Sequence, residues 1–147
     1  TGYLGNPEKT AAVIRNGWYD TGDIGRLDDL GFLHITDRLA RFSKIAGEMV
    51  PHMAIEEEYL RALGEAGPVL AVTSVADERK GERLVVFHTD AAGDADSLHA
   101  VITAAPIPNL WKPAREAYRR VDALPMTATG KLDIRHLRLL AQQDPPA

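Results

Sequence analysis

The stretch VLAVTSV (69–75), followed by the turn RKG (79–81) and then by LVVFH (84–88), decides the fold of this chain. β-branched and other apolar residues dominate both runs, and a glycine-containing turn separates them, which is the pattern of two successive strands. The sequence therefore predicts a sheet built around these two strands, and residues 117–121 are expected to add another strand.

Helices are predicted to flank these strands. Proline tolerates the first position of a helix, glycine commonly ends one, and aspartate or serine caps the N-terminus. Between such signals, apolar residues recur at helical spacing. These features indicate an α+β fold, a small domain with a short β-sheet flanked by about three helices. The residues that start, end or cap the three helices are Pro51 and Gly64, Asp96 or Ser97, and Asp133.

Residues 1–39 are β-rich and have a different character. A short helix opens at Asn6-Pro7, and a hairpin is predicted within residues 24–35. A hairpin alone is marginal in water, so this part is expected to pack on something outside the chain. We expect a domain boundary near Ala40 and, because Thr1 is not methionine, interpret the start as a cut through a longer chain.

Composition narrows the possible functions. A chain of 147 residues suggests one domain, or one domain plus a fragment. The net charge of −4 argues against nucleic-acid binding, which needs a basic face. The absence of cysteine removes disulfides and thiolate metal sites, and the five histidines lack a zinc spacing, so they are interpreted as surface or packing residues. No membrane-spanning segment and no signal peptide is found.

Two glycine turns carry the most suggestive charged residues. Lys131 follows Gly130, but the spacing of a phosphate-binding P-loop is absent, and a solvated surface lysine is the simpler interpretation. Asp23 follows Thr21-Gly22, which is a common turn; its functional alternative is a carboxylate that accepts hydrogen bonds from both hydroxyls of a ribose.

Two further positions can likewise be interpreted either as structural or as ligand-binding. Arg38 follows a predicted strand and is either a surface ion pair or a bidentate partner for a carboxylate or phosphate. Gly47 lies in Lys44-Ile45-Ala46-Gly47-Glu48 and is either a bulge or tight turn, or a backbone surface over which a thin ligand passes. The acidic run 56–58 is expected to form the wet side of its helix.

Taken in chain order, four segments resemble the C-terminal third of the adenylate-forming enzymes, the superfamily of acyl-CoA synthetases, peptide-synthetase adenylation domains and luciferases. The resemblance covers nearly the whole chain, and four motifs in order are far more specific than one. The stretch RFSKIAGEMV (41–50) is most similar to acyl-acyl-carrier-protein synthetases, a branch that includes the synthetase half of 2-acylglycerophosphoethanolamine acyltransferase. The four segments are GWYDTGD (17–23), GFLHI (31–35), residues 37–47, and LPMTATGKL (124–132).

This resemblance implies an acid–thiol ligase that works in two half-reactions. A carboxylate attacks the α-phosphate of ATP to give an acyl-adenylate, and a thiol then displaces AMP. The family's catalytic lysine bridges the attacking carboxylate and the α-phosphate, and a loop of the small domain faces the active site in the thioester step. The residues matched to these roles are Lys131 as the catalytic residue, Asp23 and Arg38 as ATP or AMP ligands, and Lys44, Ala46 and Gly47 as the surface for the thiol acceptor.

The resemblance also implies that the chain contains parts of two domains. Residues 1–39 match the C-terminal tail of the large AMP-binding domain, and residues 40–147 match the mobile C-terminal domain, or lid. The hinge position is Ala40, where the family usually has Asp or Lys, and Asp37 stands where it usually has Gly. Because a hinge needs a flexible backbone more than a given side chain, rotation is expected to survive.

The partners implied are a fatty acid or other carboxylate, coenzyme A or an acyl carrier protein, and the large N-terminal domain. ATP and Mg²⁺ are expected in the complete enzyme, with no cofactor bound tightly to this chain and no metal site in it. The chain alone is expected to be inactive, because the phosphate loop and acyl pocket of the family lie upstream. The expected location is cytoplasmic, with any membrane association coming from upstream segments. The alternative is a stand-alone interaction module that binds a carrier protein or a separate adenylation domain.

Overall fold

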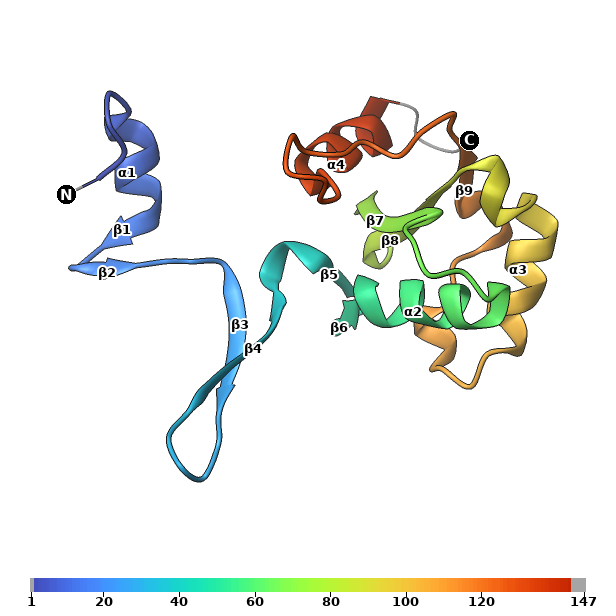
Figure 1. The fold of residues 1–147 in the computed structure, drawn as a ribbon, viewed down its shortest axis with the longest axis horizontal. Helices are drawn as coiled ribbons and strands as arrows, with labels where there is room; N and C mark the ends of the chain where they lie inside the picture. Colours follow the sequence, from blue (N-terminus) through green and yellow to red (C-terminus); the bar gives the residue numbers. More distant parts are fainter. Residues whose placement is uncertain (1, 144–147) are drawn as a thin grey trace. The chain divides into compact units, whose positions relative to one another are not determined.

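The computed structural model describes residues 2–143, and the predicted tail at 144–147 lies outside them. The chain forms two compact units that divide between Ala40 and Arg41 (Figure 1). The sequence-based boundary lies one residue earlier, between residues 39 and 40. Each unit is described by itself.

The first unit consists of one short helix and two hairpins. Asn6 caps the helix through its Oδ1, which accepts a hydrogen bond from the Lys9 amide at 2.9 Å, and proline fills the first helical position as predicted. Asp28 closes the longer hairpin by accepting from the amides of Leu30 and Phe32. The elements are α1 (Pro7–Val13), β1 (Ile14–Arg15), β2 (Trp18–Tyr19), β3 (Asp23–Leu27), β4 (Leu33–Arg38) and the single 3₁₀ turn η1 (Leu39–Arg41), which spans the division between the units.

The second unit is built on a five-stranded sheet. Strands β6, β5, β8 and β7 follow one another in antiparallel pairs. Strand β9 pairs parallel with β8, so β5 and β9 share one edge of β8 while β7 covers the other. The strands are β5 (Phe42–Ile45), β6 (Glu48–Pro51), β7 (Leu70–Asp77), β8 (Gly81–His88) and β9 (Tyr118–Arg120); the helices are α2 (His52–Leu63), α3 (Ala95–Ala104) and α4 (Ile134–Gln143), with 3₁₀ turns at Asp90–Ala92, Asn109–Trp111 and Arg115–Ala117.

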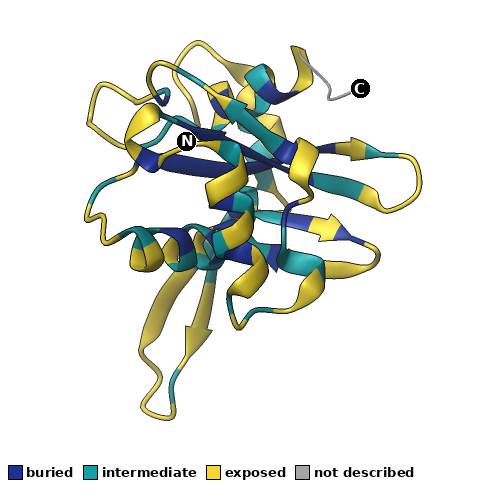
Figure 2. Cartoon of the chain, turned by 90° about the vertical axis from the view of Figure 1, so that its right-hand side faces the viewer, coloured by how far each residue is buried: buried dark blue, intermediate teal, exposed yellow. Residues whose placement is uncertain are grey.

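Both faces of this sheet are covered, which makes β7 and β8 the buried centre of the unit (Figure 2). Alternate side chains of a strand point to opposite faces. Leu70 and Val72 therefore pack with α2 and α3 in one apolar cluster, whereas Ala71 and Val75 pack with α4 in another. Burial on both faces explains why these strands are continuous apolar runs and not alternating ones. The predicted α+β fold is confirmed, including a short sheet flanked by three helices.

Helix boundaries follow the predicted signals with one exception. Gly64 ends α2 in the left-handed region with φ 72°, and Asp133 caps α4 by accepting from the His136 amide at 3.0 Å. The prediction that Asp96 or Ser97 caps α3 is wrong. Asp94 is the cap, because its Oδ1 accepts from the Ser97 amide at 2.8 Å.

The acidic run on α2 was predicted to lie on the solvent-exposed side of the helix, but one of its residues does not. Glu56 is turned inward, its side chain only 14% exposed, and its Oε1 accepts from the Val72 amide of β7 at 2.6 Å. Its Oε2 pairs with Arg41. A buried carboxylate needs such partners, and both come from segments distant in the sequence.

Candidate functional site

Asp23 and Arg38 meet in the first unit. They are paired residues in the register of β3 and β4, and the Arg38 Nε lies 2.9 Å from the Asp23 Oδ1. The Asp23 side chain is 23% exposed and that of Arg38 is 70% exposed, so both remain accessible. The surface ion pair considered for Arg38 is therefore present, and its partner is the other candidate nucleotide ligand.

The turn before Asp23 is fixed by its own side chains. The Asp20 Oδ1 accepts from the Gly22 amide at 2.9 Å, and the Thr21 Oγ1 accepts from the Asp23 amide at 3.1 Å. Gly22 has φ 69°, a left-handed conformation that favours glycine. These bonds hold the Asp23 backbone in place, so its carboxylate is presented from a rigid turn.

Lys131 lies on a tight loop in the second unit. The Thr127 amide donates to the Lys131 carbonyl at 2.7 Å, and the Gly130 amide donates to the Thr127 carbonyl at 2.9 Å. The Thr127 hydroxyl adds two contacts, accepting from the Lys131 amide and donating to the Lys131 carbonyl. The loop is also closed by a bridge between Met126 and Leu132. The backbone of Lys131 is therefore held firmly just before α4.

The Lys131 side chain points out of this ordered loop into solvent. The residue is exposed, and within residues 2–143 no carboxylate pairs with its ammonium. An exposed ammonium on a fixed backbone is available to an anion that approaches the loop.

Lys44, Ala46 and Gly47 come together at the β5–β6 hairpin. This hairpin is one of the tight turns that the sequence predicted as an alternative to a bulge or a ligand-facing surface. Ala46 has φ 49° and Gly47 φ 90°, as in the two-residue hairpin turns with both central residues left-handed. The Ala46 amide donates to the Lys80 carbonyl at 2.8 Å, and the Lys44 amide donates to the Glu82 Oε2 at 2.5 Å. Hydrogen bonds from two main-chain amides, one to a carbonyl and one to the Glu82 carboxylate, thus fix this exposed turn against the start of β8.

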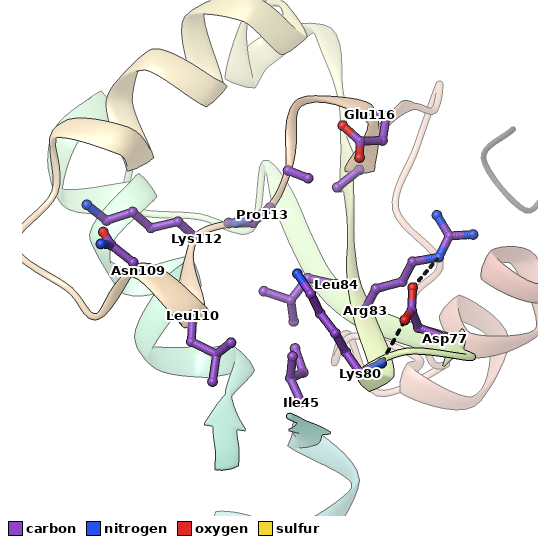
Figure 3. Close-up of a pocket in the computed structure, with 12 residues that line it drawn as sticks. Ile45, Asp77, Lys80, Arg83, Leu84, Asn109, Leu110, Lys112, Pro113 and Glu116 are labelled. Carbon is purple, nitrogen blue, oxygen red and sulfur yellow. Dashed lines mark hydrogen bonds and ion pairs between the residues drawn. The ribbon is translucent and has the colours of Figure 1, made fainter. Parts of the chain in front are cut away.

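A pocket of about 360 Å³ begins beside this hairpin, where β5 and β9 leave part of the β8 edge open (Figure 3). Three cationic residues line it, Lys80, Arg83 and Lys112, against two acidic ones, Asp77 and Glu116. The side chain of Lys80 extends into the pocket (Figure 3). Sequence reasoning missed this site, although the turn RKG (79–81) contributes one of its cations.

Asp77 forms the base of that turn. Its Oδ1 accepts from the amides of Arg79 and Lys80, each at 2.9 Å. The hydrogen bonds from these amides lower the pKa of the Asp77 carboxyl below its usual value. The carboxylate therefore stays ionised and holds the turn that presents Lys80.

The histidines lie outside these sites. His52 is fully buried on α2, and its Nε2 lies 2.5 Å from the Ser43 Oγ. Burial, reinforced by the charges of Arg41 and Arg138, lowers the pKa of His52 to about 3, so its ring is neutral. Over residues 2–143 there is no group of three His, Cys, Asp or Glu side chains placed to hold a metal ion, and none of the helices there is long and apolar enough to cross a membrane.

Sequence relatives of this chain are acyl–thiol ligases. It is 35% identical to the long-chain-fatty-acid–CoA ligase of Bacillus subtilis over 139 residues, which are 92% of this chain and 24% of the relative. It is also 35% identical over 139 residues to the fatty acid–[acyl-carrier-protein] ligase ScoC of Streptomyces coeruleorubidus, covering 92% of this chain and 26% of the relative. No protein-family model matches the chain.

Solved structures agree with these relatives. ATP-bound MatB from Rhodopseudomonas palustris matches with a TM-score of 0.72 and 25% identity, over 97% of this chain and 28% of that one. The o-succinylbenzoate CoA synthetase of Bacillus subtilis, in complex with its acyl-adenylate intermediate, matches with a TM-score of 0.67 and 25% identity, over 93% of this chain and 28% of that one.

The chain spans about a quarter of the length of the relatives it matches. The matched part of the solved structures is the C-terminal portion of each chain. This chain is therefore homologous to about a quarter of the length of acyl-CoA and acyl-carrier-protein ligases, and its structure matches the C-terminal portion of adenylate-forming enzymes.

Proposed function

We propose that this chain is the C-terminal part of an ATP-dependent, AMP-forming ligase that joins a fatty acid to the thiol of coenzyme A or an acyl carrier protein. The observation that carries the proposal is the exposed ammonium of Lys131 on a fixed loop, with no carboxylate partner among residues 2–143, in a chain homologous to acid–thiol ligases. Lys131 is the catalytic residue of the first half-reaction.

The chemistry of that step explains the need for a cation. The substrate carboxylate and the α-phosphate of ATP repel each other until positive charge lies between them. An ammonium placed there stabilises the growing charge on the phosphate oxygens in the transition state more than in the ground state, which is the condition for catalysis. The oxygen of the carboxylate bonds to phosphorus, and pyrophosphate leaves.

Asp23 and Arg38 bind the nucleotide in this proposal. A carboxylate has about four acceptor positions, so the bond with Arg38 leaves Asp23 with capacity for both ribose hydroxyls. The guanidinium of Arg38 keeps further N–H donors for a ribose or phosphate oxygen. Mg²⁺ would be held by residues outside this chain, since residues 2–143 contain no group of three His, Cys, Asp or Glu side chains placed to hold a metal ion.

The surface of the first unit supports its assignment as the tail of the large domain. Several large apolar side chains of this unit are exposed, with Trp18 at 81% and Phe32 at 65%. Apolar surface on this scale marks an interface with another part of a protein. We assign residues 1–39 to the large AMP-binding domain, residues 40–147 to the mobile domain, and the hinge to Ala40. A cytoplasmic location is part of the same proposal.

The thiol acceptor is proposed to meet the turn formed by Lys44, Ala46 and Gly47. Coenzyme A and the prosthetic arm of a carrier protein both carry phosphate, and the cationic pocket begins beside this turn. Lysine binds phosphate as a compact point charge. The pocket therefore suits the anionic part of the acceptor, while the exposed turn faces its thiol end.

Charge reversal at Lys80 tests this assignment. Lys80→Glu in the complete ligase is expected to raise the KM for the thiol acceptor about tenfold or more, because a favourable charge becomes a repulsive one in the pocket. The acid-dependent ATP–pyrophosphate exchange should change less than twofold. Arg79→Glu is the matched control, since Arg79 lies on the same turn but does not line the pocket. Equal effects of the two variants would show that only net charge matters.

The proposed function itself is tested on the complete reading frame that contains this chain. The purified product, given ATP, Mg²⁺, a fatty acid and coenzyme A or acyl carrier protein, is expected to release pyrophosphate only when the acid is present. Residues 1–147 alone should give no release above the blank. Activity of the isolated chain would contradict its role as part of a larger active site. An inactive full product that still binds carrier protein would favour the interaction module.

A further inference from the structure

The segment that follows the hinge position is tied to α2 by two buried polar contacts. Arg41 pairs with Glu56, and both side chains are largely buried, at 9% and 14% exposed. The Ser43 Oγ lies 2.5 Å from the Nε2 of His52, and both of these residues are fully buried. We call these four residues the α2 lock.

The lock joins two short stretches of chain. Arg41 ends the 3₁₀ turn Leu39–Arg41, and Ser43 lies two residues later on β5. His52 and Glu56 are four residues apart, about 6.0 Å along one face of a helix. The two contacts therefore join this segment to two positions one helical turn apart on α2: Ser43 contacts His52, and Arg41 contacts Glu56. Glu56 extends the lock into the sheet by accepting from the Val72 amide.

The first unit has its own attachment just before the hinge. The Leu39 amide donates to the Gly22 carbonyl at 2.8 Å, and Arg38 pairs with Asp23. The chain is thus held within the first unit up to Leu39 and within the second unit from Arg41.

A stability role alone does not account for the lock. The Nη1 of Arg41 is buried and has no hydrogen-bond partner within residues 2–143. A buried ion pair whose N–H groups are incompletely satisfied adds little net stability compared with apolar side chains of similar size. In some proteins, buried pairs of this kind fix the register between two elements.

We infer that the α2 lock makes residues 41–45 part of the rigid body of the second unit, so that rotation between the units takes place before Arg41. Arg41 and Glu56 are then positioning residues: they touch no substrate, but they set the poses in which Lys131 and the hairpin turn are delivered. The consequence for catalysis rests on the proposed function, whereas the rigidity of the segment does not.

Rigidity is measured on this chain by ¹⁵N relaxation. The amides of residues 42–45 are expected to have order parameters of about 0.85, as in rigid backbone. In Arg41→Ala/Ser43→Ala they should fall toward about 0.6, the flexible range, while β7 stays unchanged. Glu56→Gln is the second variant, because its amide oxygen still accepts from Val72 and so protects the fold. Glu58→Gln breaks the exposed pair with Arg61 on the same helix and should change nothing.

Low order parameters in the wild type, or unchanged ones in both lock variants, would overturn the inference. In the complete ligase, Glu56→Gln is expected to lower adenylation and thioester formation together by about tenfold or more, because a misplaced unit misaligns both steps. Loss of one step alone, or equal losses in Glu58→Gln, would contradict a positioning role. A ligase without activity would remove the proposed function and leave the relaxation result intact.

Discussion

Replacing Lys131 with alanine in the complete ligase is expected to lower the rate of acyl-adenylate formation by about two to three orders of magnitude. Removing one preorganised group that stabilises transition-state charge typically has this effect. The Thr127–Lys131 loop supplies the preorganisation, because its backbone bonds do not involve the ammonium and remain in the variant. Acid-dependent ATP–pyrophosphate exchange measures the step directly.

The second half-reaction separates this role from a general defect. Thioester formation from preformed acyl-adenylate should change less than about threefold, since the repulsion between carboxylate and phosphate no longer has to be overcome. Arg135→Ala is the matched control, because it removes an exposed cation that lies four residues after Lys131, in the first turn of α4. Equal losses in both half-reactions, or a comparable loss in the control, would refute the assignment of Lys131.

Acidification is expected to destabilise the second unit through His52. Its pKa is about 3 in the folded unit, where it is buried, and about 6.5 when the chain unfolds. Between these two pKa values, His52 is protonated in the unfolded state but neutral in the folded state. The free energy of unfolding therefore decreases as the pH falls below 6.5. Between pH 6.5 and 4.5 the free energy of unfolding should fall by about 2 kcal/mol from this residue. Urea unfolding followed by circular dichroism at several pH values measures the loss.

A variant without the titrating ring isolates the contribution of His52. His52→Phe/Ser43→Ala removes the imidazole together with its hydroxyl partner, so no polar group is left unpaired. Carboxylates with lowered pKa values, such as Asp77 and Asp94, still protonate in the variant, at lower pH. The difference between the two pH profiles is therefore the quantity of interest. Identical profiles from pH 6.5 to 4.5 would show that His52 does not control the acid sensitivity.

Local signals in the sequence were sufficient for most of the secondary structure. The apolar runs at 69–75 and 84–88 form β7 and β8, and Gly64 and Asp133 mark helix ends through their backbone conformation or their side chain. The misplaced start of α3 has a local cause as well. Asp94, Asp96 and Ser97 are all good caps, and Asp94 is the one that directly follows Gly93, whose φ is 90°.

The sequence indicated the candidate site residues one by one, but it did not show which of them lie together. The order of the motifs indicated Asp23, Arg38 and Lys131, but the pairing of Asp23 with Arg38 depends on the register of β3 against β4. Glu56 was interpreted as solvated because acidic runs usually are. Its burial depends on Arg41 and Val72, which lie 15 and 16 residues away.

Periodicity, helix capping and motif order are local features of the chain, so they were enough to predict the α+β class, the order of the elements and the resemblance to acyl ligases. The folded structure was needed to show which charges are buried together, where the cationic pocket opens and how the segment after Ala40 is tied to α2. A polar group is buried favourably only when it has a partner, and in these cases the partner lies far away in the sequence, where no local pattern reveals it.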